Sequence, residues 1–139
     1  MPPKELVDTG VLLATINTRD RWHEECAAAL RVVSLPLVTT TAVLTETFYF
    51  ASKGKGLVEH LWEFISAGGL RIAPITDADL PALEVLMRRY ADRPMDFADA
   101  TLVHVAEREG LRTILTIDHG DFETYRIGRN AKFRILPAR

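Results

Sequence analysis

Two aspartates of this sequence stand where apolar runs end. Asp8 follows such a run in the stretch ELVDTGVLL, and Asp118 ends the similar run RTILTID. Asp-Thr-Gly is the signature of aspartic proteases, in which two aspartates share one proton. An acid at the end of a buried strand is equally typical of a metal site, because ligands of open α/β sheets bind beyond the carboxyl ends of the strands. Either aspartate taken alone is also a usual N-cap for a following helix.

Glu46 and Asp99 are predicted to project from apolar faces of helices. Their neighbours at helical spacing are Ala42, Val43, Tyr49 and Phe50 around Glu46, and Met95, Leu102, Val103 and Ala106 around Asp99. Burying an unpaired carboxylate costs several kcal/mol, so each acid calls for a partner, either a buried Arg or Lys or a cation. Asp96, one turn before Asp99, is interpreted as the N-cap of its helix.

If the four acids converge, they predict a site for a hard divalent ion. Carboxylates brought together repel, and without a cation some of them would be protonated. Mg²⁺ or Mn²⁺ removes the conflict, since these ions take oxygen ligands and are held by a few carboxylates, water and substrate phosphates. The histidines show no spacing typical of zinc ligands: His23, His60, His104 and His119.

The elements that must position these acids alternate along the chain. Short runs rich in β-branched residues or leucine predict strands at 5–8, 35–40, 70–75, 112–118 and 132–137. Helical patterns occupy 10–17, 20–32, 41–52, 56–67, 77–91 and 97–109, and Gly110 is the predicted C-cap of the last. The alternation predicts one domain over residues 1–139, an α/β/α sandwich with a mostly parallel sheet of about five strands. This fold class argues against an aspartic protease, which is built from β-hairpins.

Composition narrows the classes of function and the compartment. The chain has 139 residues, of which 47% are hydrophobic and 26% charged, as expected of one globular domain. A net charge of −2 argues against a general nucleic-acid coat and leaves room for a local basic rim. Cys26 is the only cysteine, so a helix-filling role and a reducing cytoplasm are expected. No signal peptide or membrane-spanning apolar run is evident, so no membrane partner is expected.

The acids and their surroundings resemble the PIN-domain nucleases, in particular the VapC-type ribonuclease toxins of prokaryotic toxin–antitoxin pairs. The similarity runs nearly end to end through LVDTGVLLA, LTETFYF, MDFADATLVHVAE, EGLRTIL and TIDHGDF. The stretch VDTG alone is a weak signal. The resemblance implies a quartet of acids that binds divalent metal, Asp8, Glu46, Asp99 and Asp118, with Asp96 and Asp121 as additions to it.

The resemblance also implies roles for residues beside the acids. Thr9 and Thr116 would be hydroxyl partners that orient a carboxylate or water, although both also fit ordinary turn and strand positions. Phe122 matches a position that packs. The chain departs from the family at His119, since the position after Asp118 is often basic.

The implied activity is an endoribonuclease that depends on Mg²⁺ or Mn²⁺ and leaves a 5′-phosphate and a 3′-hydroxyl. The implied partners are RNA, a small VapB-like antitoxin that covers the groove, and a second copy of the chain. The segment 57–65, LVEHLWEFI, would supply a homodimer interface or part of the core through Leu57, Leu61, Trp62 and Ile65. A basic rim for RNA, or simply solvated helix faces, would come from Lys53, Lys55, Arg88, Arg89, Arg93, Arg126, Arg129, Lys132 and Arg134.

Two alternatives stay open. A phosphoryl-transfer domain of receiver or haloacid-dehalogenase type also gathers aspartates at strand ends, but it requires an acid pair or D-x-D after the first strand, which VDTGV lacks. A catalytically inactive PIN-like binding module would keep the fold and lose the chemistry. The intact acidic quartet argues against this second alternative.

Overall fold

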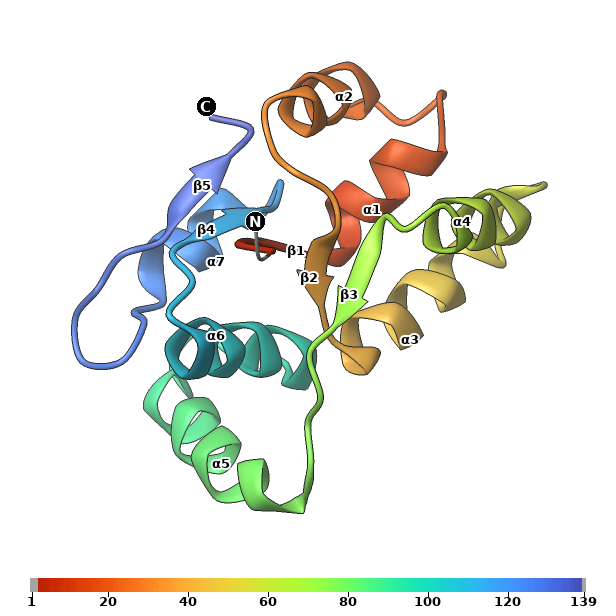
Figure 1. Cartoon of the computed structure of the whole chain (residues 1–139). Helices are drawn as coiled ribbons and strands as arrows, with labels where there is room; N and C mark the ends of the chain where they lie inside the picture. The colour runs from red at the N-terminus through yellow and green to blue at the C-terminus, as the bar shows by residue number, and fades with distance from the viewer. Residues whose placement is uncertain (1–2, 139) are drawn as a thin grey trace.

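The computed structural model describes residues 3–138, and a five-stranded sheet forms its centre (Figure 1). The strands are β1 (Glu5–Val7), β2 (Leu37–Thr39), β3 (Leu70–Ile72), β4 (Thr113–Leu115) and β5 (Arg134–Leu136). They lie in the order β3-β2-β1-β4-β5, and every neighbouring pair is parallel. The carboxyl ends of all five strands therefore open at the same edge, with β1 and β4 side by side at its centre.

Helices cover both faces of this sheet. They are α1 (Thr9–Ile16), α2 (His23–Arg31), α3 (Thr41–Ala51), α4 (Leu57–Ser66), α5 (Leu80–Arg89), α6 (Phe97–Glu109) and α7 (His119–Thr124). In Figure 1, α1 and α2 lie on one side of the sheet and α5 and α6 on the other, while α3 packs against both α1 and α6. The predicted α/β/α sandwich with a parallel sheet of five strands is confirmed.

Two departures from the predicted helices go beyond a shift of their ends by up to three residues. The stretch predicted as one helix at 77–91 begins as a 3-10 turn, η1 (Asp77–Asp79), and α5 starts only after it. Pro81 has no N–H to donate to the carbonyl of Asp77, so an α-helical hydrogen bond cannot form across this point. The short helix α7 has no counterpart among the predicted helices, because six residues are too few to display a helical period.

Polar side chains cap the starts of four helices, α1, α3, α6 and α7. Each accepts a hydrogen bond from a backbone N–H of the first turn: Asp8 from Thr9 (2.8 Å), Thr40 from Val43 (3.3 Å), Asp96 from Asp99 (2.8 Å) and Asp118 from Asp121 (3.3 Å). At the other end of α6, Gly110 closes the helix in a left-handed conformation, with φ of 70°, as predicted. The caps fix where α1, α6 and α7 begin, and with them the places of the acids.

The segment 57–65 lies in α4 and contributes one side of this helix to the core. Leu61 is fully buried, and Leu57 and Ile65 are partly buried around it. Trp62 is exposed and packs its ring against Phe48 at a centroid distance of 4.9 Å. Cys26 is buried in the core on α2, as predicted. No helix within residues 3–138, α4 included, has the length and apolar character to cross a lipid bilayer.

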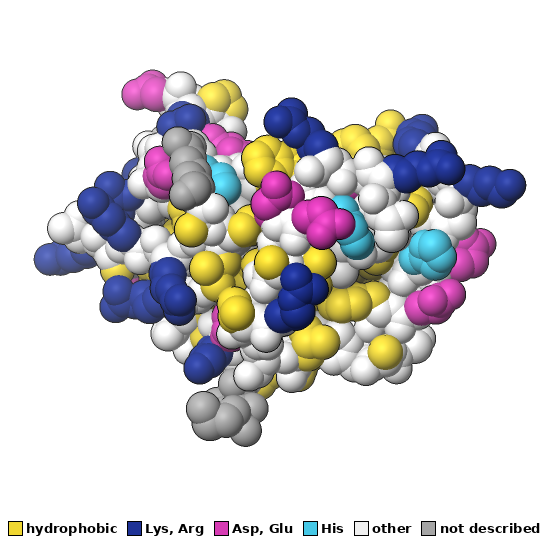
Figure 2. Space-filling model, turned by 90° about the horizontal axis from the view of Figure 1, so that it is seen from above, with side chains coloured by type: hydrophobic (Ala, Val, Ile, Leu, Met, Phe, Trp, Pro, Cys, Tyr) yellow, Lys and Arg dark blue, Asp and Glu magenta, His cyan; other side chains and the backbone are white. Residues whose placement is uncertain are grey.

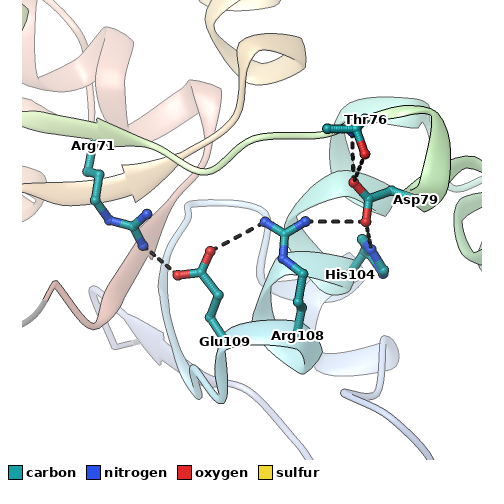
Figure 3. A network of polar contacts seen from close by, with 6 residues as sticks. All are labelled: Arg71, Thr76, Asp79, His104, Arg108 and Glu109. Atoms are coloured by element: carbon teal, nitrogen blue, oxygen red, sulfur yellow. Dashed lines mark hydrogen bonds and ion pairs between the residues drawn. The ribbon is translucent and has the colours of Figure 1, made fainter.

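A chain of charged side chains fastens β3 and η1 to α6 (Figure 3). Asp79 in η1 accepts hydrogen bonds from His104 (2.8 Å) and Arg108 (3.3 Å) of α6. Glu109 joins Arg108 (3.3 Å) to Arg71 of β3 (2.5 Å). Asp79 and Glu109 thus contact side chains of other elements, Asp79 those of α6 and Glu109 that of Arg71 in β3.

Candidate active site

The six predicted acids line one pocket at the carboxyl edge of the sheet. They come from the ends of β1 and β4, from α3, and from the starts of α6 and α7: Asp8, Glu46, Asp96, Asp99, Asp118 and Asp121. Thr9 lines the same pocket. The fold thus brings together side chains that are more than one hundred residues apart. That these acids act in catalysis stays a prediction, and the geometry is compatible with it.

Asp8 is held between two elements at the centre of the sheet. Its Oδ1 accepts the N–H of Thr9 (2.8 Å), and its Oδ2 accepts the hydroxyl of Thr116 (3.2 Å). The Thr116 hydroxyl in turn accepts the backbone N–H of Asp118 (3.0 Å). Thr116 therefore links the side chain of Asp8 to the backbone of Asp118.

Glu46 faces the pocket from α3 and is only half-buried. The hydroxyl of Thr9 donates to its Oε1 (2.6 Å), and no Lys or Arg within residues 3–138 is paired with it. The expected burial of its helical neighbours is wrong on one side, since Tyr49 is 58% and Phe50 48% exposed. No described element covers this part of α3, and an apolar pattern alone does not distinguish a covered face from an open one.

Asp99 is the acid whose surroundings oppose its charge most. It is 9% exposed, and its Oδ2 accepts a hydrogen bond from the hydroxyl of Tyr125 (2.9 Å). Burial, followed by the charges of Asp8 and Asp96, raises the pKa of Asp99 to about 8. Burial likewise raises the pKa of Asp8 to about 6, against the hydrogen bonds from Thr9 and Thr116. The charged forms of these carboxyl groups are therefore unfavourable in the pocket, and binding of a proton or a cation would remove this electrostatic cost.

The other three acids are nearer to solvent. Asp96 and Asp118 are exposed N-caps, of α6 and α7. Asp121 forms an ion pair with Arg93, with 2.8 Å between Oδ1 and Nε. Burial and the neighbouring carboxyl of Asp121 raise the pKa of Asp118. His119 is half-buried and its ring donates to the carbonyl of Pro137 (2.7 Å), so it ties α7 to the chain after β5.

Oxygen donors of this kind fit Mg²⁺ or Mn²⁺. Within residues 3–138, no three Asp, Glu, His or Cys side chains are grouped tightly enough to make a ligand set by themselves. That spacing is compatible with Mg²⁺, which keeps several waters and is usually bound through one or two carboxylates plus substrate phosphates. Asp8 and Asp99 are the two acids whose raised pKa values a bound cation would lower, because it would favour their charged forms.

Sequence reasoning missed Tyr125, which is fully buried beside Asp99. No local pattern marks it, because Tyr125 lies just after α7 and its partner Asp99 comes from another helix. Phe122 itself is fully buried and packs edge-on against Tyr125, as its predicted packing role requires.

The sequence profile of the PIN domain family matches residues 6–127, a range that includes every acid of the pocket. The chain belongs to the PIN-domain family. Among curated proteins, Ribonuclease VapC26 of Mycobacterium tuberculosis is 25% identical over 134 residues, which cover 95% of this chain and 99% of that protein. The resemblance to VapC-type PIN ribonucleases inferred from the sequence is thus confirmed.

Solved structures share the PIN fold of this chain. VapC20 of Mycobacterium tuberculosis, described as a Sarcin-Ricin loop cleaving toxin, aligns with a TM-score of 0.72 at 19% identity, over 83% of this chain and 90% of its own. VapBC2 from Rickettsia felis, bound to a DNA fragment of its promoter, aligns with a TM-score of 0.64 at 17% identity, over 94% and 97%. FitAcB from Neisseria gonorrhoeae aligns with a TM-score of 0.65 at 20% identity, over 94% of this chain and 96% of its own.

Proposed function

We propose that this PIN-domain chain is an endoribonuclease that requires Mg²⁺ or Mn²⁺ and serves as the toxin of a VapBC-type toxin–antitoxin pair. The observation that carries the proposal is the pocket in which Asp8 and Asp99 lie with raised pKa values among four further acids. The relatives support the choice of substrate, since one is named a ribonuclease and another a Sarcin-Ricin loop cleaving toxin. Residues 1–139 would act as one nuclease domain, and we expect it to work in the cytoplasm.

The acids would divide the work between holding the metal and orienting water. Asp8, Asp99 and Asp118 would hold the ion directly or through water, with Asp96 and Asp121 as further contacts. Glu46, oriented by the Thr9 hydroxyl, would position the water that attacks the phosphate. The bound ion supplies charge neutralisation at the scissile phosphate and lowers the pKa of water. No side chain needs to form a covalent intermediate, and the products would carry a 5′-phosphate and a 3′-hydroxyl.

The rim of the pocket suits an unpaired stretch of RNA. Tyr49, Phe50 and Phe97 are exposed around a hollow that shares Glu46 and Asp96 with the acidic pocket. Exposed rings of this kind stack on unpaired bases, and single-stranded loops are the usual targets of sequence-specific RNA recognition.

Positive charge at the rim is local. Lys53 lies over the Tyr49 ring at 4.7 Å, and Arg93 lies beside the pocket through Asp121. By contrast, Arg88 pairs with Glu84, and Arg134 lies at the amino-terminal edge of the sheet. Figure 2 shows basic, acidic and apolar side chains mixed over the face in view, with no continuous basic surface.

The proposed partners are a small VapB-like antitoxin and a second copy of the chain. Support for the antitoxin comes from structural neighbours that are toxin–antitoxin complexes by name, such as VapBC2. Because the antitoxin would cover the groove, activity must be measured on the chain after the antitoxin has been removed.

The test is cleavage of structured RNAs by the purified chain in Mg²⁺ or Mn²⁺, then in EDTA. Cleavage that requires metal, with 5′-phosphate products, is the expected result. Cleavage that continues in EDTA would refute the metal-dependent mechanism. A chain that binds neither metal nor RNA would instead support an inactive PIN-like module.

A further inference from the structure

Tyr125 is a buried tyrosine whose hydroxyl reaches the candidate active site. Its side chain is fully buried, and its hydroxyl donates to Oδ2 of Asp99 (2.9 Å). The ring packs edge-on against Tyr90 and Phe122, each at a centroid distance of 5.1 Å. Close packing of this kind holds a ring in one rotamer. Asp99 therefore accepts its hydrogen bond from a donor with a fixed position.

This hydrogen bond joins two elements of the pocket. Asp99 lies in the first turn of α6, whereas Tyr125 is the C-cap of α7, the helix that Asp118 caps at its other end. The bond thus fixes Asp99 relative to the helix that carries Asp118 and Asp121. Within residues 3–138 no other side chain donates to Asp99, which leaves Oδ1 available to a ligand.

We propose that Tyr125 is a positioning residue for the metal site. By engaging Oδ2, it fixes which oxygen of Asp99 faces the pocket and so increases the affinity for Mg²⁺ or Mn²⁺. The inference rests on the proposed function, because it takes Asp99 as a metal ligand. Hydrogen-bond donors behind metal ligands are worth about 10–100-fold in metal affinity or activity. Tyr125 itself would touch neither the metal nor the RNA.

A pair of tyrosine variants tests this role. Tyr125→Phe removes the hydroxyl and keeps the ring, so the packing against Tyr90 and Phe122 is retained. Tyr90→Phe is the matched control, since the Tyr90 hydroxyl accepts the backbone N–H of Arg126 (2.9 Å). MnCl₂ is titrated into each full-length chain by calorimetry without RNA. We expect the dissociation constant for Mn²⁺ to rise about tenfold in Tyr125→Phe and to stay unchanged in Tyr90→Phe.

Cleavage of RNA across a range of Mn²⁺ concentrations is the second measurement. A positioning role predicts that Tyr125→Phe needs more Mn²⁺ for half-maximal cleavage and regains the parent rate at saturating Mn²⁺. Weaker metal binding alone is overcome at saturating Mn²⁺, so loss of cleavage at every Mn²⁺ concentration would overturn the inference.

The outcomes separate this inference from the proposed function. Equal Mn²⁺ affinity in Tyr125→Phe and the parent chain would overturn the inference and leave the nuclease intact. A parent chain that binds Mn²⁺ but cleaves no RNA would overturn the nuclease, while the calorimetry still decides the role of Tyr125. A parent chain that binds no Mn²⁺ would overturn both.

Discussion

The acidic pocket and the charged network beside α6 shift the pKa values of their carboxyl groups in opposite directions. In the network, Asp79 accepts the backbone N–H of Thr76 (2.8 Å) and hydrogen bonds from His104 and Arg108. These donors, the Thr76 N–H first and then His104, lower the pKa of Asp79 to about 2. The hydrogen-bond partners of this acid all favour its charge.

In the pocket, the neighbours of Asp99 oppose its charge. Burial and the charges of Asp8 and Asp96 raise the pKa of Asp99 to about 8, and the Tyr125 hydroxyl offsets only part of this effect. An arrangement that costs stability, and in which no Lys or Arg of residues 3–138 is paired with Asp99, is typical of functional sites. The network supports the fold, whereas the pocket has the electrostatics expected of the cation site that we propose.

The largest expected effect comes from removing charge in the pocket. Asp99→Asn keeps the shape of the side chain and takes away a predicted metal ligand, so RNA cleavage should fall by at least about 100-fold. The measurement is the rate of cleavage of one RNA at fixed Mn²⁺, beside circular dichroism to verify the fold. Asp8→Asn should behave in the same way. Retained activity in a folded Asp99→Asn chain would contradict the assignment of the site.

The two regions should also respond to pH with opposite sign. The folded chain binds a proton at Asp99 more tightly than the unfolded chain does, because the pKa is about 8 instead of 3.8. In EDTA the free energy of unfolding should therefore decrease as pH rises from 3.8 to 8, with Asp8 contributing up to about pH 6. The pKa of Asp79 is lowered, so its stabilisation is present above pH 3.8 and is lost as pH falls towards 2.

Urea denaturation across this pH range measures both trends. Asp99→Asn should reduce the decrease in the free energy of unfolding between pH 3.8 and 8. Asp79→Asn should reduce its loss between pH 3.8 and 2. Mn²⁺ should restore stability mainly at high pH, where it no longer competes with protons. A free energy of unfolding that rises with pH between 4 and 8 in EDTA would be inconsistent with the electrostatics of the pocket.

Local patterns in the sequence were enough to predict the fold. Runs of β-branched residues and polar caps act over a few positions, so the five strands and the helix 97–109 could be predicted, the latter with its Gly110 cap. The six-residue α7 was missed because it is shorter than the window of about 11–18 residues in which a helical period is recognised. The break at Pro81 was overlooked, although a proline inside a helical pattern is a signal for one.

The candidate site shows where sequence reasoning ends. Acids on apolar faces and at strand ends could be identified without a structure, since an unpaired charge in such a place is unusual. The partners of an acid could not be identified, because they are distant in sequence. Asp79 meets His104 from another helix, and Asp99 meets Tyr125 across α7. Both pairs depend on tertiary packing that no local pattern encodes.

A smaller effect is expected from the network itself. Asp79→Asn keeps an acceptor for the Thr76 N–H but removes the charge that attracts His104 and Arg108, so the melting temperature should fall. Cleavage should stay within about twofold of the parent chain, as for other substitutions away from a functional site. Asp77→Asn, in the same turn and exposed, is the control and should change neither property. A large loss of cleavage in Asp79→Asn would mean that the network also positions α6 for catalysis.

The smallest effect is expected at Arg93, where the pocket does contain a compensated acid. Arg93 pairs with Asp121 at 2.8 Å and both side chains are partly exposed, so Arg93→Gln should change stability by less than about 1 kcal/mol. If Arg93 contacts a phosphate, RNA affinity should fall and the slope of log K against log salt should become shallower by about 0.7. Arg88→Gln is the matched control, since Arg88 has a similar ion pair with Glu84 on α5. Fluorescence anisotropy with single-stranded RNA in the Asp99→Asn background measures binding without cleavage, and equal slopes for both arginine variants would exclude Arg93 from the RNA path.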